Sequence, residues 1–190
     1  MPNWNRLARL ASIMRTVANT KPKSFDISAW FADDEGMSEF DVDLVKPFIT
    51  DNVLTKFASG ETRVIAEGFC GTTQCVLGHA ALDPEFHKDG LIVATDLWNG
   101  GVTYLVPQIY FTGDGIDPEN LQTGTDAGAA FFELKELEAK IMFGTSGLAT
   151  ADWYSTSSGD QVTALDVAER LEKAVAEKDL GMADIIADYW

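Results

Sequence analysis

The stretch that decides the fold reads Gly68-Phe69-Cys70-Gly71-Thr72-Thr73-Gln74-Cys75-Val76-Leu77-Gly78-His79-Ala80. It contains both cysteines of the chain and one of its two histidines. A turn at Gly71 followed by a helix that Thr72 or Thr73 caps would explain most of these residue types. In that interpretation Cys75 packs as a small apolar side chain, and Gly78 lets a second element approach closely. The stretch therefore predicts a structural turn and helix.

Two chemical interpretations of the same stretch stay open. Cys70, Cys75 and His79 form a C-x4-C-x3-H pattern, and the last two would lie one turn apart on a helix that begins near Gln74. A structural zinc ion needs four ligands, and this pattern supplies three. His87, Asp83 or Glu85 could serve as the fourth, but the spacing is not that of the usual zinc pairs, so we expect no metal and no other cofactor. The second interpretation is an enzyme with Cys70 or Cys75 as nucleophile and His79 as base, because a helix N-terminus lowers the pKa of a thiol. No third, orienting residue can be identified, so a non-enzymatic protein is favoured and no catalytic residue is assigned.

Size and composition indicate one folded domain over residues 1–190. Apolar residues make up 46 % of the chain, which is enough for a core. No apolar run approaches the ~20 residues of a membrane helix, and the N-terminal residues do not resemble a signal peptide. Two cysteines give no disulfide framework. We therefore expect a soluble cytoplasmic protein that does not bind a membrane.

The charge is large and unevenly placed. The formal net charge is −16; residues 1–25 contain five basic residues and no acid, whereas residues 26–51 contain eight acids and one lysine. Such a field repels phosphates, so direct binding of nucleic acid is not expected. The predicted binding residues for a partner with a basic surface lie in an acidic surface loop at about 32–43, and they are Asp33, Asp34, Glu35, Glu39, Asp41 and Asp43. A mimic of nucleic acid is the alternative for the same acidic face.

The N-terminal residues 3–19 show the spacing of an amphipathic helix. Asn3 is a suitable N-cap, and apolar residues recur at helical intervals after it. These residues are Trp4, Leu7, Leu10 or Ala11, Met14 and Val17. The arginines lie off this stripe, so we expect them on a solvated face. Lys21-Pro22 ends the helix, because proline disfavours helical backbone at the residue before it.

The middle of the chain is interpreted as short elements separated by loops. Short helices are predicted on either side of Pro47 within 42–57, followed by a brief strand at 63–66. A β-hairpin is predicted to pair 91–94 with 102–106, with 109–111 as its extension, and an exposed loop follows at about 112–124. The helix that begins near Gln74 is expected to stop at Asp83-Pro84.

Helical periodicity returns after residue 125. Two helices are predicted at 126–132 and 134–143, followed by C-terminal helices at about 163–190, the first of them capped by Thr163. The expected packing residues are Phe131, Leu134, Leu137, Ile141 and Met142 in the pair, and Leu165, Ala168, Leu171 and Val175 in the capped helix. The fold class that follows is α+β and mainly α, a single helical domain with a small antiparallel β-hairpin.

Several segments resemble a group of small proteins from bacteriophages and bacteria. They are Phe25-Asp26-Ile27-Ser28-x-Trp30, Cys70-Gly71-Thr72-x-x-Cys75-Val76-x-Gly78-His79-Ala80, Phe132-x-Leu134-x-x-x-Glu138-Ala139-x-x-x-Phe143 and Thr163-Ala164-x-Asp166-Val167-Ala168-x-x-Leu171. The family pattern centres on CGT-x-x-C-x-x-G-[HW]-A, and the similarity runs from about residue 7 to about 175. The resemblance implies no catalytic residue. Since family members place His or Trp at position 79, it also argues against an obligate metal ligand or base there.

The resemblance implies a function of a general kind. Phage accessory proteins bind or inhibit a host target, so a binding or regulatory protein of the host cytoplasm is expected. The target would be a host protein with a basic surface or a small signalling ligand. This chain departs from the family pattern in the acidic loop at 32–43 and in the segment 99–125, where a function of its own is expected.

Overall fold

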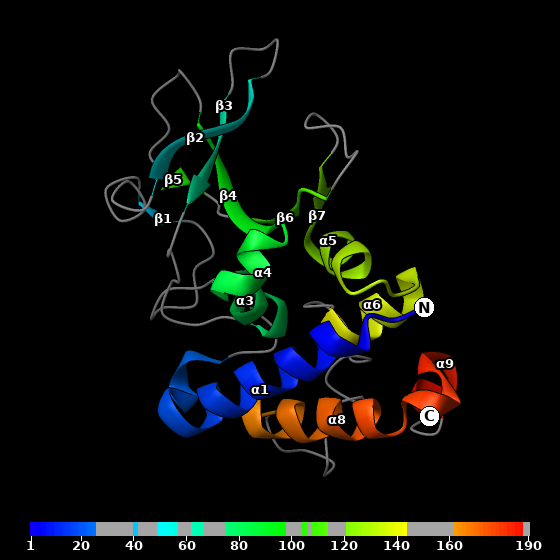
Figure 1. Ribbon diagram of the computed structural model, residues 1–190. Coiled ribbons are helices and arrows are strands. Elements are labelled where there is room, and N and C mark those ends of the chain that lie inside the picture. The colour runs from blue at the N-terminus through cyan, green and yellow to red at the C-terminus, as the bar shows by residue number, and fades with distance from the viewer. Residues whose placement is uncertain are drawn as a thin grey trace.

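The structure is a computed structural model of residues 1–190, with a β-sheet at one end and most of the helices at the other (Figure 1). It describes residues 1–25, 40–41, 49–56, 62–66, 75–97, 104–105, 108–113, 121–143 and 162–187. The helices are α1 (Trp4–Thr20), η1 (Pro22–Ser24), α3 (Val76–Ala81), α4 (Pro84–Lys88), α5 (Gly124–Phe131), α6 (Glu136–Phe143), α8 (Ala164–Ala176), η4 (Lys178–Leu180) and α9 (Met182–Ala187). The strands are β1 (Phe40–Asp41), β2 (Ile49–Lys56), β3 (Thr62–Ala66), β4 (Leu91–Leu97), β5 (Tyr104–Leu105), β6 (Gln108–Phe111) and β7 (Gln122–Thr123).

The described strands form one larger sheet and one small one. Five antiparallel strands follow the order β2-β3-β4-β6-β7, and β1 pairs with β5. More of the described residues lie in helices than in strands, so the predicted class, α+β and mainly α, is confirmed. The sheet is larger than the predicted hairpin. The partner of 91–94 is β6 rather than 102–106, because the buried Ile109 and Tyr110 of β6 supply apolar side chains on both faces of β4.

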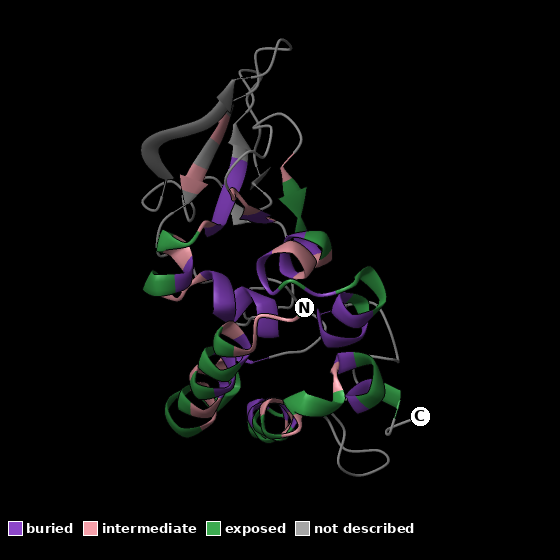
Figure 2. Ribbon diagram, turned by 45° about the vertical axis from the view of Figure 1, so that its right-hand side comes forward, coloured by how far each residue is buried: buried purple, intermediate pink, exposed green. Residues whose placement is uncertain are grey.

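The two faces of β4 belong to two apolar clusters. Leu91 and Val93 join the main core, whereas Ile92 and Ala94 pack with Tyr110 in a smaller cluster on the other side of the sheet. Successive side chains of a strand point to opposite faces, so the pleat itself makes this division. The main core lies between the sheet and the helices, where the buried residues of the helices gather (Figure 2).

One predicted helix in the middle of the chain is wrong. Residues 49–56 form strand β2 instead of a helix after Pro47, because β3 gives them an antiparallel partner, with register shifts along the pair. The predicted strand at 63–66 is confirmed as part of β3. Pairing with a distant segment has therefore decided the structure here, where local periodicity indicated a helix.

The ends of two predicted loops are strands. Phe40–Asp41 lie within the expected acidic loop and form β1, and Gln122–Thr123 lie within the expected loop 112–124 and form β7. Each of these strands has two residues and pairs with a neighbouring strand. Two residues are too few to show the alternating pattern from which a strand is predicted. The rest of the acidic loop and residues 114–120 lie outside the described residues.

Helix α1 confirms the N-terminal prediction. The side chain of Asn3 accepts a hydrogen bond from the backbone N–H of Arg6, as an N-cap should. Its fully buried residues are Leu7, Leu10, Ala11 and Met14. None of the helices in the described part of the chain has both the length and the apolar character that crossing a membrane requires.

Helix α8 starts as predicted and buries Ala168 and Leu171 as expected, with one error at Leu165. Thr163 and Asp166 form a reciprocal capping box at its N-terminus. Leu165 was expected inside and is 41 % exposed. The buried residues are Ala164, Val167, Ala168, Leu171 and Ala174. Three of these are alanines, and small side chains let α8 lie close against α1, to which it runs antiparallel (Figure 1).

The predicted helical pair is confirmed as α5 and α6, with one error. Leu137 was expected to pack and is 69 % exposed. Its neighbour Glu138 is buried instead, because its carboxylate accepts a hydrogen bond of 2.8 Å from the backbone N–H of Lys135 at the start of α6. A polar side chain that satisfies the helix terminus has turned Leu137 towards solvent.

Candidate functional site

Helix α3 carries the described part of the central stretch. It begins at Val76, slightly later than predicted, because Cys75 is still extended and occupies the N-cap position. All residues of α3 are buried, and Cys75 is 2 % exposed. A nucleophilic thiol must reach its substrate, and Cys75 instead lies in the main core. Cys70 and the predicted caps Thr72 and Thr73 lie outside the described residues.

His79 is the polar residue of α3, and it is 9 % exposed. Its Nε2 atom lies 3.0 Å from the carbonyl oxygen of Ser24 in η1. Its ring stacks on Phe25, with 6.3 Å between the ring centroids and 24° between the ring planes. The histidine therefore fixes the segment that follows α1 against α3.

Burial keeps the His79 ring neutral. Loss of solvation lowers its pKa to about 4, and the positive charge of Lys21 also lowers it, against the opposing effect of the Ser24 carbonyl. At neutral pH the ring therefore carries one proton. Since Nε2 faces a carbonyl acceptor, the proton is on Nε2, which donates to Ser24, and Nδ1 is left as a hydrogen-bond acceptor.

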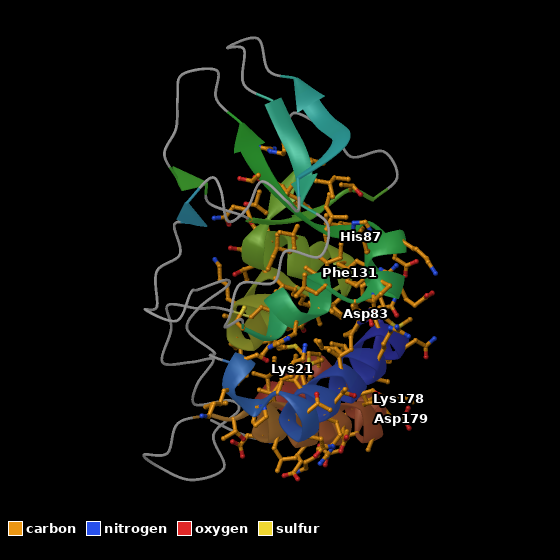
Figure 3. All side chains as sticks on the ribbon, turned by 90° about the vertical axis from the view of Figure 1, so that its left-hand side faces the viewer. Lys21, Asp83, His87, Phe131, Lys178 and Asp179 are labelled. Atoms are coloured by element: carbon orange, nitrogen blue, oxygen red, sulfur yellow. The ribbon has the colours of Figure 1, made fainter. Side chains whose placement is uncertain are left out.

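His79 also lines a groove of about 400 Å³ between α1 and the α3–α4 connection. The lining residues are Arg9, Ser12, Ile13, Thr16 and Val17 from α1, and His79, Leu82, Asp83 and Pro84 from the other side. In Figure 3, Asp83 lies beside α1 towards its N-terminal end, and Lys21 lies at the opposite end of the same helix. The groove thus runs along α1, and it was not predicted from the sequence because its walls are about sixty residues apart in the chain.

An ion pair closes one end of the groove. Arg9 donates through Nε and Nη2 to the two carboxylate oxygens of Asp83, at 2.7 and 2.8 Å. Asp83 is also the N-cap of α4 and accepts from the backbone N–H groups of Glu85 and Phe86. Burial would raise the pKa of Asp83, but the Arg9 and backbone hydrogen bonds outweigh it, so that the pKa is lowered. Asp83-Pro84 was expected only to stop a helix; it begins α4 as well.

Ser12, His79 and Asp83 line one groove, and together they are the residue types of a hydrolytic triad. The contacts of the described residues do not connect them in that way. Asp83 binds Arg9 and the start of α4, and the Nε2 atom of His79 binds Ser24. A triad needs the carboxylate on one ring nitrogen and the hydroxyl on the other. The arrangement is therefore one of positioning and not of nucleophilic activation.

The arginines of α1 lie at the surface, as predicted, but they are engaged in ion pairs there. Besides the Arg9 pair, Arg6 donates to the carbonyl oxygen of Phe131 at 2.6 Å and pairs with Asp89. Arg15 pairs with Glu169 and Glu172 of α8. The three arginines of α1 therefore each have an acidic partner within the molecule.

The predicted binding residues of the acidic loop are almost entirely outside the described residues. The structure places only the backbone of Asp41, in β1. Asp33, Asp34, Glu35, Glu39 and Asp43 lie outside the described part. Within that part, no group of His, Cys, Asp and Glu side chains comes together in a way that could hold a metal ion.

Most described residues of the motifs that resemble the phage and bacterial family are buried in the protein. In the central motif, Cys75 to Ala80 are buried. In the second motif, Phe132, Leu134, Ala139 and Phe143 are core residues. Comparisons with models of protein families, with curated proteins and with solved structures find no match.

Proposed function

We propose that this chain is a non-enzymatic binding or regulatory protein, similar to phage accessory proteins, that acts on a host target in the cytoplasm. The support is the use of its most chemically suggestive residues. Cys75 lies in the core, and His79 is neutral and bound to a backbone carbonyl. A buried cysteine and a histidine held by a backbone carbonyl stabilise the fold, and neither is arranged as a catalytic group would be.

The observation that carries the proposal is the groove beside His79. Its volume of about 400 Å³ falls within the ~300–1,000 Å³ of small-molecule sites. It combines an apolar floor with a few polar groups, as such sites do. Among the described residues of its wall, Arg9 and Asp83 form an acid–base pair that is already joined by two hydrogen bonds.

The proposal also gives the acidic segment a role, which is to attract a partner before binding. We assign Asp33, Asp34, Glu35, Glu39, Asp41 and Asp43 to the encounter with a basic host protein. Long-range attraction of this kind accelerates association and contributes less to the lifetime of the complex. Neutralising four of these residues should therefore slow association at low salt and leave dissociation nearly unchanged.

The test is capture followed by quantitative binding. Immobilised protein is offered to a bacterial lysate and to its small-molecule extract, and mass spectrometry identifies what is retained. The purified target should then bind saturably, one to one, and be recovered chemically unchanged. Cys75→Ala should bind it equally well in the folded fraction. Recovery of a converted product, or absence of any saturable target, would contradict the proposal.

A further inference from the structure

We propose that the groove between α1 and the α3–α4 connection binds a small uncharged molecule that carries an amide-type group, with an N–H donor beside a carbonyl acceptor, on an apolar body. This inference rests on the proposed function and adds to it a site and a class of ligand. Three features of the groove support it: its floor, its polar groups and its local charge.

The floor is apolar and incompletely covered. Ile13, Val17 and Leu82 pack against the main core and remain partly exposed on the groove side. An apolar ligand body placed over them would remove the rest of their surface from water, which is the main source of affinity in such sites. The same floor gives no advantage to a fully polar ligand.

The polar groups of the groove offer an acceptor and donors. His79 lines the groove, its Nε2 is bound to Ser24, and the acceptor that we assign to the site is its remaining ring nitrogen, Nδ1. The donors are the hydroxyl group of Ser12 and the outer edge of the Arg9 guanidinium, whose other edge holds Asp83. An amide presents the complementary pair, an N–H and a carbonyl oxygen, in one plane.

The local charges disfavour ions of either sign. Arg9 and Asp83 largely cancel each other at one end of the groove. A ligand carboxylate would enter a field set by a net charge of −16, and the guanidinium among the described lining residues, that of Arg9, is already paired with Asp83. A ligand ammonium would meet the positive charge of Arg9 and, beside His79, that of Lys21, while three hydrogen bonds already engage Oδ1 of Asp83 and its Oδ2 is held by Arg9. An uncharged polar group avoids both penalties.

The experiment uses three matched probes of similar size: cyclohexanecarboxamide, cyclohexanecarboxylate and cyclohexylammonium. Each is titrated into the full-length protein while the side-chain methyl signals are followed by NMR. The carboxamide should shift the methyl signals of Ile13, Val17 and Leu82 saturably, in the millimolar range expected of so small a ligand. The two ions should bind at least about fivefold more weakly. A second hollow of about 360 Å³, which Phe25, Val162 and Leu165 help to line, provides the internal control for non-specific binding.

Two variants and one control test the assignment of groups. His79→Gln keeps a donor that can reach the Ser24 carbonyl but replaces the Nδ1 acceptor by an amide oxygen at a different position, so carboxamide affinity should fall about fivefold or more. Ser12→Tyr fills the groove from an exposed position on α1 and should abolish the shifts without unfolding the protein. Leu165→Ala, in the other hollow, should change neither the carboxamide affinity nor the methyl shifts of the groove residues. Since Ser12→Tyr does not alter the core, it keeps the test valid if His79→Gln folds poorly.

The outcomes separate this inference from the proposed function. Equal binding of all three probes, or carboxamide shifts that persist in Ser12→Tyr, would overturn the inference. If a host extract still supplies a target that Ser12→Tyr binds normally, the protein is a binding protein and its site lies elsewhere. If the carboxamide binds as expected and no host target is found, the groove assignment stands and the proposed function fails.

Discussion

Two faces of α1 perform different tasks. One face, Leu7, Leu10, Ala11 and Met14, is buried and closes the main core. The other, Arg9, Ser12, Ile13 and Thr16, lines the groove. The second set is the first moved by two positions, which rotates it by about 200° around the helix axis. One side of α1 is therefore a buried apolar face, and the other is a mixed apolar and polar face that lines the groove.

Because the two faces differ, a substitution on one face of α1 should affect stability, whereas a substitution on the other should affect binding. Substitutions on the core face should change the free energy of unfolding and affect binding only through it. Substitutions of Ser12 and Thr16, the exposed groove residues that do not pack on the core, should change binding and leave the free energy of unfolding nearly constant. The predictions below compare the two faces, starting from the largest effect.

The largest effect is expected for Leu10→Ala. Leu10 is fully buried, and removal of its side chain leaves a cavity in the main core. The free energy of unfolding should fall by about 2–5 kcal/mol, measured by urea denaturation. Ser12→Ala, two positions away on the exposed side, is the matched control and should change it by less than about 0.5 kcal/mol. Similar losses in both variants would show that α1 does not have two distinct faces.

The second effect is a dependence of stability on pH that comes from His79. Its pKa is lowered from 6.5 to about 4 in the folded protein, so between these values the unfolded chain binds the proton more readily. The unfolding free energy should therefore decrease as pH falls from about 6.5 to 4, by on the order of 3 kcal/mol in total. Asp83, with its lowered pKa, loses its contribution only at lower pH.

The control for this pH dependence is His79→Gln, in which the group no longer titrates. Urea denaturation at several pH values should show a flatter profile between pH 6.5 and 4 in the variant than in the wild type. If both profiles have the same slope in this window, the dependence belongs to other groups and the burial of a neutral imidazole is not what stabilises the fold.

The third effect concerns the helix that covers the core face of α1. Thr163→Ala removes the capping box at the start of α8 and should lower the free energy of unfolding by about 1 kcal/mol. Thr163→Ser keeps the hydroxyl and should restore most of it. Carboxamide binding in the groove should be unchanged in both variants. A loss of groove binding together with the cap would mean that the two sides of α1 are coupled.

The local signals in the sequence predicted the helices well. Asn3 and Thr163 mark two helix starts by their capping side chains, and the 3.6-residue period located α1, α5, α6 and α8. The same period placed Ala168 and Leu171 correctly on the buried face of α8 and misplaced Leu165, which it favoured over Ala164 and Ala174. Those alanines are buried where α8 approaches α1, a requirement that the helix does not reveal by itself.

Elements that depend on distant partners were predicted less well. Strand β2 was interpreted as helical, since its pairing with β3 has no local signature. The groove was missed for the same reason: Ser12 and Thr16 have no significance until Leu82 and His79 lie opposite them. The sequence did single out His79, but as a ligand or base, and its actual partner is the carbonyl group of Ser24.

The most direct test of this account is the imidazole ¹⁵N NMR spectrum of His79 as a function of pH, with His87→Asn to assign the signals. The account predicts a neutral ring at pH 7, with the proton on Nε2, an unprotonated Nδ1 that shifts when cyclohexanecarboxamide is added, and a pKa of about 4. A ring that titrates near its ordinary value of 6.5, or a proton on Nδ1, would contradict it.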